Sequence, residues 1–134
     1  MRKDVYTRLS TISESDILRI HEKAGKGKHR GTGIGNRPKF RKLVEDIRRD
    51  AKLERPFIDM IAAIFDDIER DPQPFQDCNH RTAMHLGRFI AFEFGYNLRY
   101  SGSEGERLRE RWPDMQIGEL KKWISQHLVA LKGD

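Results

Sequence analysis

The sequence has few of the features that mark several large classes of protein. It contains a single cysteine, Cys78, which excludes an internal disulfide framework and fits a reducing compartment, so we expect a cytoplasmic protein. No apolar run approaches the roughly 20 residues that a membrane-spanning helix needs, and we expect no membrane partner. No signal peptide opens the chain, which agrees with a cytoplasmic location.

Length and charge set further bounds. With 134 residues, 35% of them charged and 37% apolar, the chain is expected to form a single globular domain over residues 1–134. Its net charge of +5 favours an acidic partner. The basic residues are spread along the chain, and their densest block is only RPKFRK, which argues against a dedicated nucleic-acid surface.

The pattern of apolar residues predicts an all-α fold. Helical spacing and the start and stop signals predict about six helices, over residues 13–24, 38–51, 56–70, 79–94, 103–112 and 116–131. Two of them, 56–70 and 79–94, are apolar nearly all round and should therefore lie at the centre of the fold. Residues 1–12 are expected to be a tail or a short edge strand, and residues 96–100 a short extended link.

Residues 25–38, GKGKHRGTGIGNRP, contain five glycines and show no helical periodicity. A phosphate-binding P-loop is excluded because no apolar strand precedes the segment and no Gly-Lys-Ser/Thr ends it. We expect a mobile flap that borders the functional site.

The most informative stretch is QPFQDCNHRTA, residues 73–83, at the start of the second central helix. A helix N-terminus offers unpaired amide groups and a partial positive charge, which together favour an anion. Arg81 adds a bidentate phosphate contact and Asn79 a neutral donor, while Asp77 is a hard oxygen ligand suited to Mg²⁺. Each residue alone also has an ordinary structural role, and it is their joint spacing that favours a phosphate site.

These residues resemble the signature of the Fic/Doc family, His-x-Phe-x-Asp/Glu-Gly/Ala-Asn-Gly/Lys-Arg, with Phe75, Asp77, Asn79 and Arg81 in register. The segment DILRIHEKAG also resembles the first helix of Doc-type toxins, and the Gly-rich segment stands where those proteins carry a flap. The resemblance implies a compact helical Fic/Doc-type domain. It implies a transferase that moves AMP or phosphate from ATP, with Mg²⁺, to a hydroxyl of a target protein.

The resemblance also implies partners and roles. The target in the Doc branch is a translation elongation factor, and a separate antitoxin inhibits the enzyme, so both are expected partners of a toxin. The implied catalytic positions are Gln73, Asp77 and Arg81, the nucleotide-binding ones are Cys78, Asn79, His80 and Arg81, and the metal ligand is Asp77.

Four departures from the family's pattern matter. Gln73 stands where the family has the His that acts as general base, and an amide has no useful basicity near neutral pH, so we expect an inactive form. A natural pseudoenzyme and an engineered change would both explain it. Cys78 replaces a Gly or Ala, and His80 replaces the Lys of the Doc branch with a pH-dependent cation. The second Arg of the Fic branch is Met84, which places the chain nearer the Doc branch.

Other hypotheses compete with the transferase. Cys78, His80 and His85 with His29 would form a zinc site, but their spacing is not a standard one. Cys78 at a helix start would act as a nucleophile if its pKa were lowered. Arg81 and His85 faintly resemble the Arg–His pair of helical toxin ribonucleases. A non-catalytic nucleotide-binding pseudoenzyme is a further alternative.

Overall fold

The structure, a computed structural model, describes residues 2–25 and 33–131. Within these residues seven α-helices and one small two-stranded antiparallel sheet share a single hydrophobic core, which confirms the predicted all-α class. The helices are α1 (Arg2–Leu9), α2 (Glu14–Ala24), α3 (Arg37–Lys52), α4 (Phe57–Glu69), α5 (Asn79–Glu93), α6 (Gly102–Arg111) and α7 (Ile117–Gln126). A 3₁₀ turn, η1 (Trp112–Asp114), joins α6 to α7, and the strands are β1 (Tyr96–Leu98) and β2 (Leu128–Ala130).

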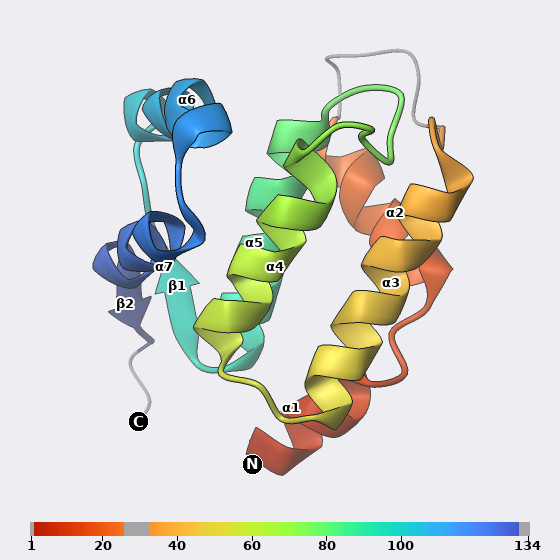
Figure 1. The fold of residues 1–134 in the computed structure, drawn as a ribbon. Coiled ribbons are helices and arrows are strands. Elements are labelled where there is room, and N and C mark those ends of the chain that lie inside the picture. Colours follow the sequence, from red (N-terminus) through yellow and green to blue (C-terminus); the bar gives the residue numbers. More distant parts are fainter. Residues whose placement is uncertain (1, 26–32, 132–134) are drawn as a thin grey trace.

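Helices α4 and α5 form the centre of the molecule, as their apolar composition predicts. They lie side by side, with α2 and α3 on one side and α6, α7 and the strands on the other (Figure 1). Phe65 and Ile61 of α4 and Ile90 of α5 are fully buried. Because both central helices contact elements on either side, the loop between them, residues 70–78, lies where the two halves of the fold meet.

The helix starts follow local signals in the sequence. Ser13 and Asp16 form the predicted capping box of α2, in which each side chain accepts a hydrogen bond from the other residue's amide. The side chain of Asn36 caps α3 by accepting a hydrogen bond from the Lys39 amide, and Pro38 lies in the first turn. Gly95 follows α5 with a φ of 90°, a conformation that favours glycine.

Two terminal segments differ from the sequence-based prediction. The first residues form helix α1 rather than a tail or an edge strand, because Val5, Tyr6 and Leu9 are buried on one helical face. The Tyr6 hydroxyl donates a 2.6 Å hydrogen bond to the Arg55 carbonyl, which ties α1 to the connection between α3 and α4. The last predicted helix, 116–131, ends at Gln126, and the residues after it pair with β1 as strand β2.

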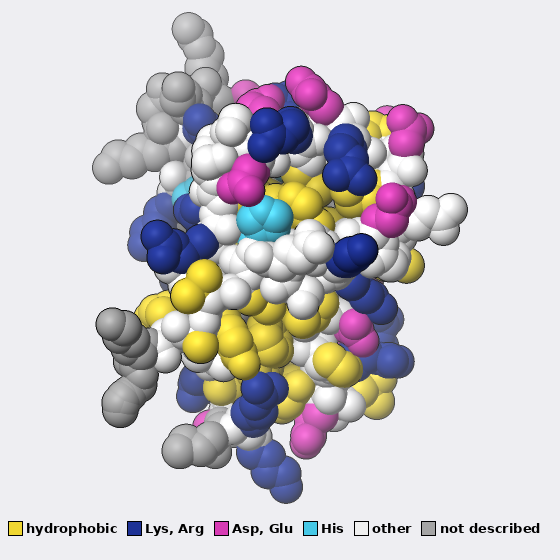
Figure 2. All heavy atoms as spheres, turned by 90° about the vertical axis from the view of Figure 1, so that its left-hand side faces the viewer, with side chains coloured by type: hydrophobic (Ala, Val, Ile, Leu, Met, Phe, Trp, Pro, Cys, Tyr) yellow, Lys and Arg dark blue, Asp and Glu magenta, His cyan; other side chains and the backbone are white. Residues whose placement is uncertain are grey.

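The face formed by α6, α7 and the strands has two parts (Figure 2). Basic and acidic side chains are interspersed in its upper half, and hydrophobic side chains gather in its lower half. Ile117 and Val129, each 45% exposed, belong to these elements. No helix in the described ranges is long and apolar enough to cross a membrane.

Candidate functional site

The loop between α4 and α5 is anchored by one aromatic ring. Phe75 is 3% exposed, and its ring stacks on His21 of α2 with centroids 4.0 Å apart. The Phe40 ring of α3 meets it edge-on at 5.8 Å. The anchor therefore fixes the loop against α2 and α3 as well as against the two helices that it joins.

Asn79, in the first turn of α5, holds the same loop through hydrogen bonds. Its Oδ1 accepts from the Phe75 amide at 3.0 Å, and its Nδ2 donates to the Phe75 carbonyl at 3.0 Å. Nδ2 also donates to Oε1 of Gln73 at 3.3 Å, while Nε2 of Gln73 donates to the Glu69 carbonyl at 3.4 Å. Both the oxygen and the nitrogen of the Gln73 side-chain amide are thus hydrogen-bonded.

The end of the Gly-rich segment is joined to this loop. Ile34 forms an isolated antiparallel bridge with Phe75, and the amides of Gly35 and Asn36 donate to the Pro74 carbonyl at 2.8 and 3.1 Å. Residues 33–36 therefore lie against the loop at Pro74 and Phe75, and the role of the segment as a flap of the site stays a prediction. The prediction of mobility covers residues 25–38, of which 26–32 lie outside the described residues.

The N-terminus of α5 faces the loop with its first amides unused within the helix. Cys78 precedes the helix in a left-handed conformation, with φ 58° and ψ 34°, and makes no side-chain cap. The first helical bond runs from the Thr82 amide to the Cys78 carbonyl at 3.0 Å, so the amides of residues 79–81 come before it. Oδ1 of Asp77 accepts from the Cys78 amide at 2.7 Å, which fixes the carboxylate beside these amides.

A cavity of about 410 Å³, which we call the loop cavity, opens at this helix end. All six residues implicated by the sequence line it: Gln73, Asp77, Cys78, Asn79, His80 and Arg81. The structure thus brings together residues whose proximity the sequence only suggested. The cavity is polar, and Arg109 and Glu106 of α6 complete its wall.

Two side chains that line the loop cavity, Arg81 and His80, have fixed partners. A guanidinium nitrogen of Arg81 donates to the Ala24 carbonyl at 3.2 Å, which orients the side chain without neutralising its charge. His80 pairs through Nδ1 with the carboxylate of Glu69, whose side chain is only 6% exposed. Sequence reasoning missed Glu69, the last residue of α4, although it lies only four positions before Gln73, and it missed Arg109, which reaches the cavity from α6.

The structure bears on two competing hypotheses. Burial, and after it the charge of Asp77, raises the pKa of the Cys78 thiol above its ordinary value, which disfavours the thiolate that a nucleophile requires. The part of the chain that is described contains no group of three or more His, Cys, Asp or Glu side chains able to hold a metal ion. His29 of the hypothetical zinc site lies outside the described residues.

The residues of the loop cavity fit ATP with Mg²⁺. Mg²⁺ usually takes one or two carboxylates and completes its shell with water and substrate phosphates, and Asp77 is the residue that would hold it here. Asp77 is exposed and uses one oxygen on the Cys78 amide. The amides at the start of α5, with Arg81 and Arg109, supply donors and positive charge for phosphates.

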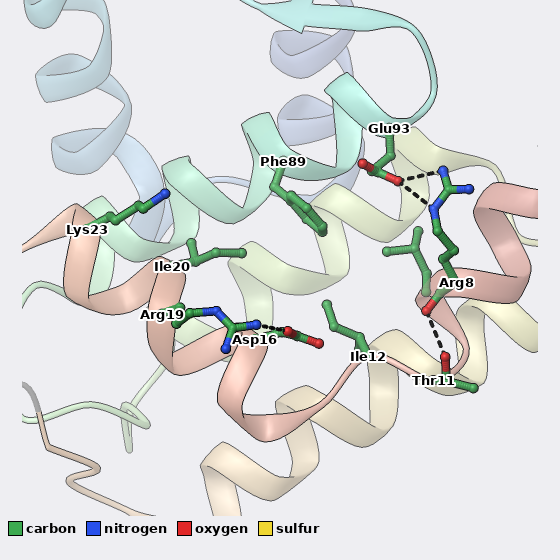
Figure 3. A pocket seen from close by; sticks show the side chains of 10 residues that line it. Arg8, Thr11, Ile12, Asp16, Arg19, Ile20, Lys23, Phe89 and Glu93 are labelled. Carbon is green, nitrogen blue, oxygen red and sulfur yellow. Dashed lines mark hydrogen bonds and ion pairs between the residues drawn. The ribbon is translucent and has the colours of Figure 1, made fainter.

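A separate groove lies between α1, α2 and the far end of α5, and the six predicted site residues are not among those that line it (Figure 3). Its rim carries two ion pairs, Arg8 with Glu93 at 2.8 Å and Arg19 with Asp16. Lys23 lies at the opposite end of the groove from Glu93 (Figure 3).

No protein-family model matches the chain, and no significant match exists among curated proteins or solved structures.

Proposed function

We propose that this protein is a Fic/Doc-type transferase of the cytoplasm, the toxin of a toxin–antitoxin pair, in a form that Gln73 makes inactive. Its substrates are ATP with Mg²⁺ and a hydroxyl group of a target protein, for which a translation elongation factor is the candidate. The observation that supports this proposal is the loop cavity, which places Asp77, Arg81 and the first amides of α5 around one space. AMP transfer and phosphate transfer differ in which phosphorus atom is attacked.

In either case the chemistry needs a proton acceptor. The target oxygen forms a bond to phosphorus, the bond to pyrophosphate or to ADP breaks, and the hydroxyl proton passes to a base. At position 73 the chain presents an amide, which does not take up a proton near neutral pH. Gln73 is nevertheless held by Asn79 and by the Glu69 carbonyl, so the position is structurally prepared for a side chain of similar length.

The test has a binding arm and a transfer arm. In the binding arm, millimolar ATP with Mg²⁺ should raise the melting temperature of the unaltered chain, because a ligand of the native state stabilises it by about 1.4 kcal/mol at ten times its Kd. Arg81→Ala should remove most of the shift. Arg107→Ala, an exposed residue of α6 outside the cavity lining, is the matched control. A melting temperature that ATP leaves unchanged would count against the proposal.

In the transfer arm, Gln73→His should restore nucleotide-dependent labelling of target proteins in a bacterial lysate by about 10² to 10⁴-fold over the unaltered chain. Gln73→Ala, which also removes the amide but supplies no base, should label nothing. Release of pyrophosphate indicates AMP transfer, and release of ADP indicates phosphate transfer. RNA cleavage without any need for nucleotide would instead support the ribonuclease hypothesis.

A further inference from the structure

A second cavity, of about 510 Å³, opens on the face of α5 beyond its first turn. We call it the α5-face cavity. It lies between the last turn of α2, which contributes Lys23, and the start of α6, which contributes Gly102. His80, Arg81 and Glu106 line both this cavity and the loop cavity, so the two adjoin.

The α5-face cavity carries an excess of positive charge. Lys23, Arg81 and Arg88 line it, while Glu106 is the one carboxylate in its wall. Within the described residues no ion pair joins any of the three cations to a carboxylate, and Glu106 lies 3.9 Å from Arg109 of its own helix. The cations therefore stay available to a ligand.

The two arginines are held in place by contacts that leave their charge intact. Nε of Arg88 donates to the Leu98 carbonyl at 3.4 Å, and its guanidinium lies 4.4 Å from the centre of the Tyr100 ring. Arg81 is held by the Ala24 carbonyl. They lie seven positions apart on α5, a rise of about 10 Å, so the positive charge extends along the cavity and does not converge on one point.

His85, which lies between the two arginines on α5, senses this charge. Burial lowers the pKa of His85, and the charges of Arg88 and then Arg81 lower it further. An anion bound beside the arginines would offset their effect. His85 is therefore a natural probe of whether the cavity is occupied.

We propose that the α5-face cavity binds a polyphosphate group, with Arg81 and Arg88 at its two ends and Lys23 on its rim. A chain of phosphates fits because it carries several charges over a length that one phosphate does not cover. The cavity's own charges and contacts support this proposal, and only the assignment of the polyphosphate to a nucleotide rests on the function proposed above.

The direct test uses tripolyphosphate with the full chain. NMR titration of the imidazole protons should show that tripolyphosphate raises the pKa of His85. Arg88→Gln should weaken tripolyphosphate binding about tenfold through loss of a charge-assisted contact, whereas Arg88→Lys should retain most of the affinity and so exclude a folding defect. Lys122→Gln, an exposed residue of α7 that lines neither cavity, removes the same charge and should have no effect.

Comparison of ATP with AMP separates the two sources of polyphosphate. If the group is the tail of a nucleotide in the loop cavity, Arg88→Gln weakens ATP binding about tenfold and leaves AMP binding unchanged. If it is a separate ligand, tripolyphosphate binds equally well in the presence of saturating AMP, and Arg88→Gln leaves ATP binding unchanged. A rise in the pKa of His85 without any ATP binding supports the cavity assignment but contradicts the proposed function. An unchanged pKa of His85 at saturating tripolyphosphate overturns the proposal.

Discussion

Asn79 determines how the residues of the loop cavity share their hydrogen bonds. Both hydrogens of its Nδ2 are used, one by the Phe75 carbonyl and one by Oε1 of Gln73. A phosphate that took a hydrogen bond from Nδ2 would have to replace Gln73. Direct contact between Asn79 and a nucleotide stays a prediction, whereas its hold on the loop is visible in the structure.

We expect Asn79→Ala to lower the free energy of unfolding by about 2 to 3 kcal/mol, because it leaves the amide and the carbonyl of buried Phe75 without their partners. Urea-induced unfolding measures the change. Asn97→Ala, the same substitution at an exposed position of β1, should stay within about 0.5 kcal/mol of the unaltered chain. Equal effects of the two substitutions would contradict the role given to Asn79.

Helices α3 and α4 are joined by a charged cluster in which two buried carboxylates share one exposed lysine. Nζ of Lys42 lies 2.8 Å from Oδ2 of Asp46 and 3.0 Å from Oδ1 of Asp67. Burial, and after it the hydrogen bond shared with Asp46, raises the pKa of Asp67 to about 7. Burial would also raise the pKa of Asp46, but hydrogen bonds with Asp67 and Lys42 lower it overall. At pH values below about 7, Asp67 therefore keeps its proton while Asp46 is ionised.

This proton makes stability depend on pH. In the unfolded chain Asp67 has its ordinary pKa of 3.8, whereas in the folded protein its pKa is about 7. The folded state binds more protons between these values, so the free energy of unfolding contributed by Asp67 falls as the pH rises from 3.8 to about 7.

Asp67→Asn removes this dependence, because the amide stays neutral and can still accept from Lys42. We expect the free energy of unfolding of the variant, relative to that of the unaltered chain, to rise by about 2 to 3 kcal/mol between pH 5 and pH 8, with most of the rise below pH 7. Denaturant unfolding at a series of pH values measures the difference. Asp66→Asn, a partly exposed neighbour paired with Arg70, should give a difference that is constant over this range. A constant difference for Asp67→Asn as well would refute the assignment.

At the scale of elements, helix starts were predicted correctly where residues next to each other in the chain determine them. The capping box at Ser13 and the proline at position 38 mark helix starts wherever the rest of the chain lies. Strand β2 was missed because Leu128 and Val129 continue a helical spacing, and their partner strand lies about thirty residues earlier in the chain. The loop cavity was predicted from a contiguous motif, whereas Arg109 enters it through packing that no local pattern encodes.

At the scale of the whole molecule, the core continues across the central helices. Phe65 of α4 packs against Trp112 with ring centroids 6.4 Å apart, and Leu120 and Ile124 of α7 are fully buried in the same cluster. Lys121 adds a 3.1 Å ion pair to Asp59 of α4. The C-terminal elements thus share one core with the N-terminal helices, and we expect them to unfold together.

Cooperative unfolding is testable because both tryptophans, Trp112 and Trp123, lie after α5, whereas most of the helical signal comes from the helices before them. Tryptophan fluorescence and far-UV circular dichroism should give the same denaturation midpoint. Ile124→Ala should shift both midpoints together, with a loss of about 3 kcal/mol. Val129→Ala, at a position 45% exposed, should change the free energy of unfolding measured by either signal by no more than about 0.5 kcal/mol. Two separate transitions would show that the C-terminal elements fold independently.

Cys78 combines a left-handed backbone conformation with the only thiol of the chain. A side chain at φ 58° costs about 1 kcal/mol, so glycine would be the less strained residue there. The chain nevertheless carries its only thiol at this position, partly exposed on the wall of the loop cavity. A thiol-reactive fluorophore would therefore attach at one defined point without any engineered cysteine. The protein then becomes its own optical sensor, in which a change of dye emission reports filling of the cavity whether or not any group is transferred.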